Sequence, residues 1–131
     1  MTWADYDKAL LSLTLWREAR GEGRDGMRAV AHVIANRIKA GMAKDWDHVI
    51  TAKWQFSSMT AAADPELILW PEQPDPAFED AMQIAELIYS GGDFDLTNGA
   101  TCYFNPAVVL PSWAAKMTKV ASIGHHDFYK P

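Results

Sequence analysis

The chain has 131 residues, of which 49% are hydrophobic and 11% aromatic, so it suits one globular domain rather than a disordered segment. Its formal net charge of -5 excludes a global positive field that would recruit nucleic acid or an anionic membrane, and it is unfavourable for binding an anionic polymer. Cys102 is the single cysteine, which excludes an intrachain disulfide and makes a multi-cysteine zinc site unexpected.

The first predicted helix runs from about Trp3 to Arg20. Thr2 and Asp5 have the spacing of a capping box, and Gly21 provides a stop. Apolar residues recur at helical spacing on two faces, formed by Trp3, Tyr6, Leu10 and Leu13 and by Leu11, Thr14, Leu15 and Glu18. Glu18 is therefore expected to project from a largely apolar surface near the end of the helix.

Two further helical segments are predicted before residue 60. Asp25 is expected to cap a helix that ends at Gly41. The residues expected to face inward on this helix are Met27, Val30, Ile34 and Ile38. The stretch from Asp45 to Met59 is expected to form a short helix followed by a loop.

Asp64-Pro65 and Asp75-Pro76 each combine a capping residue with a proline suited to a first helical turn. The second pair opens an amphipathic helix that ends before Gly91. Its expected inward residues are Phe78, Met82, Ala85, Ile88 and Tyr89.

The pattern changes toward the C-terminus. Ala100 to Phe104 and Lys119 to Ile123 are predicted to be short strands, with a helical segment from Ser112 to Met117 between them. Gly124 turns the chain into a final segment from His125 to Tyr129. The sequence therefore predicts one α+β domain over residues 1–131, mostly α, with a small antiparallel β-sheet toward the C-terminus.

No membrane insertion is expected. The uncharged stretch from Thr97 to Ala115 is interrupted by asparagine, glycine and proline residues, which a membrane-spanning helix would not tolerate. The N-terminus carries Asp5 and Asp7 where a signal peptide has positive charge. We therefore expect the chain to be made in the cytoplasm without a signal peptide.

Glu18 is the first candidate for a catalytic group. An apolar surrounding removes water from its carboxyl group, and the negative end of the helix dipole disfavours its anion. Both effects favour a protonated acid near neutral pH, which is the form that a glycosidic oxygen needs in order to leave. The alternative is a solvated helix-end residue, which is the usual situation of a glutamate.

Other titratable residues offer weaker candidates. Glu22 follows the helix stop and is expected to be a loop carboxylate that holds nearby backbone N–H groups. His125 and His126 are adjacent in a segment expected to be extended, so they would point to opposite sides and would not share a metal ion. Cys102 paired with a histidine is a conceivable nucleophile but has no motif around it. We predict neither a metal site nor a cofactor.

Four sequence blocks follow one another along the chain. The first block is Glu18 to Glu22, continued by Gly26 and by residues 29–37, Ala-Val-Ala-His-Val-Ile-Ala-Asn-Arg. The later blocks are Trp54-Gln55-Phe56-Ser57, residues 98–106 with Trp113, and residues 123–129. In this order they resemble the SleB-type cell wall hydrolases, a family that includes spore cortex-lytic enzymes and phage lysis proteins. The resemblance spans nearly the whole chain, from Leu13 to Tyr129.

The resemblance implies a lysozyme-like catalytic domain that cleaves peptidoglycan glycan strands between N-acetylmuramic acid and N-acetylglucosamine, as a lytic transglycosylase. It implies Glu18 as the catalytic acid and base. The supporting or substrate-binding candidates are Glu22, Gln55, Ser57, Tyr103 and His126. Where this chain has Cys102, the family often has histidine, and His126 rather than His125 matches the family histidine.

The implied biological role is that of a phage endolysin. We expect a monomer that binds no nucleic acid and reaches the cell wall from the host cytoplasm through a holin. Three alternatives remain open: a hydrolytic muramidase, a non-catalytic glycan-binding module, and a metal-dependent amidase or peptidase. A muramidase would need a second carboxylate, for which the candidates are Glu22, Asp25 and Asp127.

Overall fold

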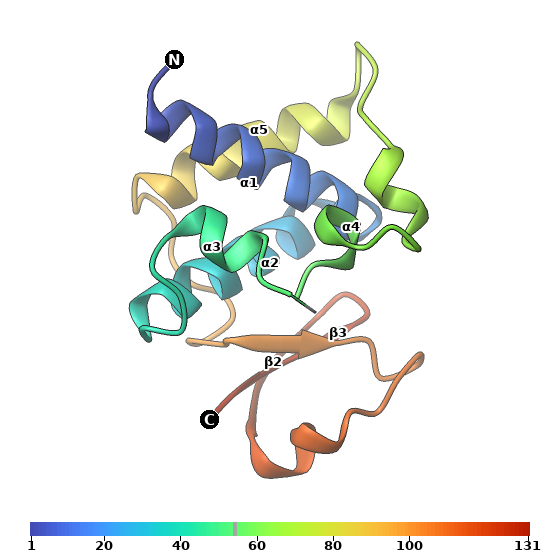
Figure 1. The fold of residues 1–131 in the computed structure, drawn as a ribbon. Coiled ribbons are helices and arrows are strands. Elements are labelled where there is room, and N and C mark those ends of the chain that lie inside the picture. The colour runs from blue at the N-terminus through green and yellow to red at the C-terminus, as the bar shows by residue number, and fades with distance from the viewer. Residues whose placement is uncertain (54) are drawn as a thin grey trace.

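The computed structural model describes residues 1–53 and 55–131, and Trp54 of the second block lies outside the described residues. The α-helices are α1 (Trp3–Ala19), α2 (Gly23–Lys39), α3 (Trp46–Ile50), α4 (Ser57–Thr60) and α5 (Pro76–Tyr89). The 3-10 helices are η1 (Arg20–Glu22), η2 (Pro65–Ile68) and η3 (Ser112–Lys116), and the strands are β1 (Cys102–Phe104), β2 (Thr118–Ile123) and β3 (His126–Lys130). The predicted class, mostly α with a small antiparallel sheet near the C-terminus, is confirmed (Figure 1).

Helix α2 lies between the other helices and the sheet (Figure 1). One side of it contributes Met27, Val30 and Ile34 to a core shared with α1, α3 and α5. The other side places Ala29 and Val33 against the sheet. Apolar residues on both sides of α2 thus join the sheet to the helical layer, and the boundary between these two parts is where a cleft can form.

The two apolar faces of α1 have different environments. Leu11 and Leu15 are fully buried in the core, whereas Trp3 and Tyr6 are 83% and 43% exposed. The predicted capping box is present, because the Thr2 hydroxyl accepts a hydrogen bond from the Asp5 amide and the Asp5 carboxylate accepts one from the Thr2 amide. The face that carries Glu18 is therefore the core face, while the Trp3–Tyr6 face is partly exposed to solvent.

The sheet has the strand order β1-β3-β2, with all neighbours antiparallel. Tyr103 in β1 pairs with Phe128 in β3, and a register irregularity interrupts the β2–β3 pairing between Lys119 and Ala121. Phe128 is buried in the core shared with α2. Because the Tyr103 ring stacks on Phe128 at a centroid distance of 5.5 Å, the packing of β3 fixes the position of Tyr103.

Several predicted details are wrong. Helix α2 begins at Gly23, so Asp25 lies in its first turn instead of capping it. On α5, whose predicted start at Asp75-Pro76 is confirmed, Met82 is 46% exposed, and Ala81 and Ile84 are buried. The prediction that Met82 faces inward is wrong, because this helix carries more apolar residues than fit on the face that the core covers. Among the described residues, none of the helices combines the length and apolarity required to cross a membrane.

Candidate functional site

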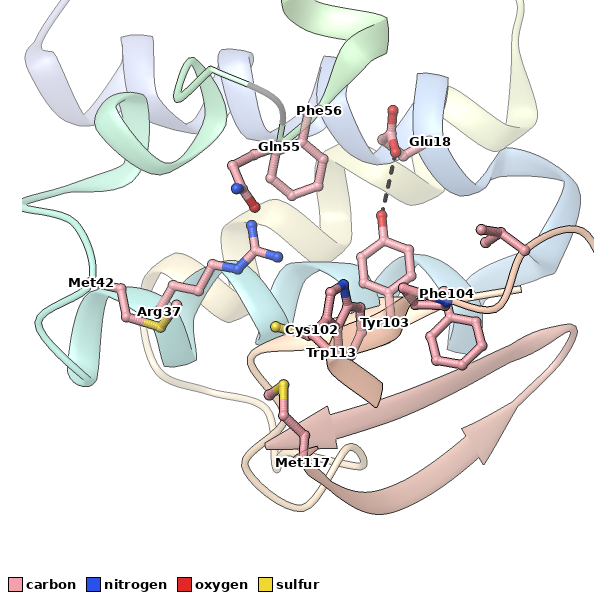
Figure 2. Close-up of a pocket in the computed structure, with 12 residues that line it drawn as sticks. Glu18, Arg37, Met42, Gln55, Phe56, Cys102, Tyr103, Phe104, Trp113 and Met117 are labelled. Atoms are coloured by element: carbon pink, nitrogen blue, oxygen red, sulfur yellow. Dashed lines mark hydrogen bonds between the residues drawn. The ribbon is translucent and has the colours of Figure 1, made fainter. Parts of the chain in front are cut away.

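A cleft of about 630 Å³ opens between the helices and the sheet (Figure 2). Its lining includes side chains from α1, α2, β1, η3 and the intervening loops. These residues are Glu18, Arg37, Met42, Gln55, Phe56, Cys102, Tyr103, Phe104, Val109, Pro111, Trp113 and Met117. The lining thus combines a carboxyl group, a guanidinium and an amide with apolar and aromatic surface, which is typical of sites that bind organic ligands.

Glu18 lies in the last turn of α1 and is half-buried, with its carboxyl group at the cleft. The Ser58 hydroxyl donates a hydrogen bond of 2.5 Å to Oε2, and the Tyr103 hydroxyl donates one of 3.3 Å to Oε1. Figure 2 shows Tyr103 rising from β1 toward Glu18. The carboxyl group is therefore held from two sides, by the helical part and by the sheet.

Burial raises the pKa of Glu18 above its ordinary value, and the nearby negative charge of Asp64 adds to the rise. The hydrogen bonds from Ser58 and Tyr103 favour the carboxylate and oppose this rise without cancelling it. Glu18 therefore has the properties of an acid that keeps its proton to higher pH than an exposed glutamate, as the sequence predicts.

The serine that contacts Glu18 is Ser58, not the predicted Ser57. Ser57 is exposed, and its hydroxyl donates to Asp64. Ser58 is buried, and its backbone carbonyl accepts a hydrogen bond from Arg17. The sequence contains both serines after Phe56, but it does not reveal which of them faces α1, because the short helix α4 turns the chain at this point.

This contact predicts different effects for two adjacent substitutions. Ser58→Ala removes a hydrogen bond that lowers the pKa of Glu18, so this pKa should rise further. Ser57→Ala leaves that bond in place and should change the pKa of Glu18 much less, because Ser57 acts on Glu18 only through Asp64. The measurement is a carboxyl ¹³C NMR titration of Glu18 in both variants, and an equal change in the two would contradict the assignment of Ser58.

Glu22 does not line this cleft but connects η1 to the β2–β3 turn. Its carboxylate lies 3.0 Å from His125 Nδ1 and 3.6 Å from His126 Nδ1. The prediction that the two histidines point apart is thus wrong, because His125 lies in the turn after Gly124 and not in an extended strand. Burial alone would raise the pKa of Glu22, but hydrogen bonds from His125 hold it below its ordinary value.

His126 packs edge-on against Tyr103 at a ring-centroid distance of 5.2 Å. Burial lowers the pKa of His126, which keeps its ring uncharged at neutral pH. Through Tyr103 it supports the hydroxyl that donates to Glu18. His126, which lies next to Glu22, therefore supports the side of the cleft that Tyr103 forms. Both residues act on Glu18 indirectly, through the Tyr103 hydroxyl.

The other predicted candidates have different surroundings. Asp25 is exposed and pairs with Arg28, and Asp127 pairs with Lys119 on the sheet. Cys102 lines the cleft, and among the described residues its sulfur contacts the Thr101 hydroxyl at 3.9 Å rather than a histidine. Within the described residues, Glu18 is the carboxylate that lines the cleft.

Sequence reasoning missed Arg37, which lines the cleft together with the predicted Gln55. Gln55 is exposed, whereas Arg37 is 9% exposed and donates from Nε to the Thr101 carbonyl at 2.7 Å. The resemblance contains Arg37 within its first block, but the sequence offers no signal that its guanidinium reaches a cleft formed by residues 64 positions later.

A group of side chains with metal-ligand chemistry lies elsewhere. Asp45, Asp47 and His48 have ligand atoms within 4.8 Å of one another at the beginning of α3. The Asp45 carboxylate caps this helix by accepting a hydrogen bond from the His48 amide, so the grouping has a structural explanation.

Comparison with known proteins gives a consistent result. Residues 21–129 match the family described as cell wall hydrolase. This match begins after Glu18, so the role of Glu18 depends on the geometry of the cleft. A spore cortex-lytic enzyme of Halalkalibacterium halodurans is 31% identical over 96% of this chain and 35% of its own length. The chain spans 35–46% of the length of the curated relatives it matches.

Two solved structures have the same fold. The catalytic domain of the Bacillus cereus SleB protein has a TM-score of 0.77 and 28% identity, with 96% of this chain and 91% of that chain covered. The catalytic domain of the germination-specific lytic transglycosylase SleB from Bacillus anthracis has a TM-score of 0.76 and 27% identity, covering 99% and 97%.

Proposed function

We propose that this chain, which belongs to the cell wall hydrolase family, cleaves peptidoglycan glycan strands as a lytic transglycosylase with Glu18 as its acid and base. The bond cleaved is the one between N-acetylmuramic acid and N-acetylglucosamine. The observation that carries the proposal is a raised-pKa carboxyl group in a cleft to which, among the described residues, no second carboxylate contributes.

The number of carboxylates distinguishes the two ways of cutting this bond. A hydrolytic muramidase normally uses two, one as the acid and another that activates water or attacks the sugar. Glu22, Asp25 and Asp127 are the candidates for the second role, and each is engaged elsewhere with a histidine, an arginine or a lysine. A transglycosylase needs a single acid and base, because its nucleophile is the C6 hydroxyl of the muramic acid itself.

The reaction then proceeds in two proton transfers. Protonated Glu18 gives its proton to the glycosidic oxygen as the bond from that oxygen to C1 of the muramic acid breaks. The resulting Glu18 carboxylate accepts the proton of the C6 hydroxyl as its oxygen bonds to C1. The products are a 1,6-anhydro end and a free C4 hydroxyl, and Glu18 has regained its proton.

The surrounding side chains support this chemistry. Ser58 and Tyr103 hold the two oxygens of the carboxyl group in place between the two transfers. Trp113 and Phe104 supply aromatic surface in the cleft, on which the apolar faces of sugar rings pack well. Gln55 offers an amide for sugar hydroxyls.

Product analysis tests the proposal directly. When sacculi are digested in ¹⁸O-labelled water, we expect new muramic acid ends that are one water lighter than reducing ends and carry no label, as read by mass spectrometry. A parallel digest with a hydrolytic muramidase is the control, because its ends incorporate the label. Labelled reducing ends from this chain would favour the muramidase alternative, and uncut strands would favour a glycan-binding module.

The biological setting stays a prediction. We propose that the domain acts as a monomer in the role of a phage endolysin, made in the host cytoplasm and delivered to the wall by a holin. The curated relatives are named spore cortex-lytic enzymes, so the same domain type also occurs in a different setting.

A further inference from the structure

Arg37 is a buried cation without a partner of opposite charge at the cleft. Its side chain leaves α2 and is 9% exposed, and within the described residues no carboxylate forms an ion pair with it. Its Nη1 is buried and finds no hydrogen-bond partner in the part of the chain that the structure describes. A buried charge without an anionic partner is costly, and an anionic ligand would offset this cost.

The position of the guanidinium is fixed from two sides. Nε donates to the Thr101 carbonyl at 2.7 Å, and the guanidinium carbon lies 5.5 Å from the centre of the Phe56 ring. Figure 2 shows the guanidinium pointing toward the exposed Gln55 at the same cleft that holds Glu18. These contacts orient the terminal nitrogens but do not neutralise their charge.

The charge balance of the cleft favours an anion. With Glu18 protonated, Arg37 is the charged residue among the described side chains that line it. Arg37, Tyr103 and Glu18 line the same cleft, and burial raises the pKa of Tyr103, a rise that the positive charge of Arg37 opposes. The chain as a whole has a formal net charge of -5, so Arg37 provides a local exception to an unfavourable field.

We propose that Arg37 binds a carboxylate on the muramoyl side chain of the glycan strand. The inference rests on the proposed function and concerns how the site distinguishes the two sugars of the strand. N-acetylmuramic acid differs from N-acetylglucosamine by a lactyl ether that ends in a carboxyl group. A planar guanidinium suits such a group because two of its N–H donors can contact both carboxylate oxygens. The carboxylate belongs either to the lactyl group itself or to the stem peptide attached there.

Binding to the inactive Glu18→Gln protein tests this without cleavage. Three glycan preparations are compared by calorimetry: peptide-free strands with free lactyl carboxylates, the same strands after methyl esterification, and strands that carry stem peptides. We expect the free lactyl strands to bind about 10- to 100-fold more tightly than the esterified strands, the range for a hydrogen bond to a charged group. A preference for the stem-peptide strands alone would assign the carboxylate to the peptide.

The variants separate recognition from structure. Arg37→Gln should abolish the preference while leaving the affinity for esterified strands unchanged, and Arg37→Lys should keep part of it. Arg24→Gln is the matched control, because Arg24 is an exposed residue of the same helix that pairs with Asp80. Should Arg37→Gln fail to fold, Arg37→Lys serves instead, since it keeps the charge but loses the paired planar donors and should reduce the preference for the free carboxylate without abolishing it.

Two results would overturn the inference. One is equal affinity of the Arg37 protein for all three preparations, and the other is an equal loss on all of them in Arg37→Gln. Either leaves the proposed function standing, because that function is judged on cleavage by the unmodified chain. Failure of the unmodified chain to cut any strand would instead remove the proposed function.

Discussion

Glu18→Gln is expected to lower the rate of glycan cleavage by about 10³-fold, which is within the range for loss of a general acid and base. The amide has the shape of the carboxyl group, and its oxygen can still accept a hydrogen bond from Ser58 or Tyr103 while its NH2 group donates to the other hydroxyl. It has no proton to give to the oxygen on C4 and cannot take one from the C6 hydroxyl. The measurement is the rate at which new muramic acid ends appear in a digest of purified sacculi.

The matched control is Glu86→Gln, because Glu86 is an exposed glutamate on α5 that pairs with Lys8 and lies away from the cleft. It makes the same replacement of a carboxyl group by an amide and should leave the rate within about twofold of the original. If Glu18→Gln also cleaves at that rate, then Glu18 is not the acid and the mechanism fails.

Stability supplies a second readout for Glu18→Gln. Because the pKa of Glu18 is raised in the folded state, the folded chain binds this proton more tightly than the unfolded chain does. The ionised carboxyl group therefore destabilises the fold increasingly as the pH rises above the unfolded value, and this cost vanishes at lower pH. We expect Glu18→Gln to melt at least as high as the original protein at pH 7, with the difference shrinking toward pH 4, so a loss of activity cannot be attributed to unfolding.

Local signals predicted the helices well where they were unambiguous. The capping box at Thr2 and the Asp75-Pro76 start are formed by residues next to each other in the chain, so the sequence alone contains them. The core face of α1 was not predictable in the same way, since both of its faces are apolar. Only the packing of α2 and α5 against Leu11 and Leu15 decides which face is covered.

The residues of the candidate site also differ in whether a local sequence pattern could predict them. Glu18 could be predicted because its apolar face and the following glycines are local, and the ordered blocks supported it. Ser58 and Arg37 could not, because their roles arise from contacts with residues 40 and 64 positions away in sequence. Residue patterns within a single helix do not indicate contacts between segments so far apart in the sequence.

Gly124→Ala is expected to lower the free energy of unfolding by about 1.5–3.5 kcal/mol, combining the strain of a left-handed residue with the displacement of the Glu22 carboxylate from its hydrogen bonds to His125. Gly124 has φ +58°, and an added Cβ would lie 2.5 Å from Glu22 Oε2. Urea unfolding measures the change. Gly41→Ala isolates the strain, because Gly41 has φ +73° and an added Cβ there meets nothing within 4 Å, so its cost should be about 1–2 kcal/mol.

A double-mutant cycle then tests whether Glu22 is the obstacle. In a Glu22→Ala background the oxygen that the new Cβ would meet is gone, so Gly124→Ala should cost no more than Gly41→Ala does. An unchanged cost in that background would mean that Glu22 does not limit the turn. The turn matters for the site because Glu22 holds His125 and His126, and His126 packs against the Tyr103 ring whose hydroxyl donates to Glu18. A glycine and a glutamate outside the cleft thus help to determine how firmly the sheet holds Tyr103 against Glu18, the proposed acid.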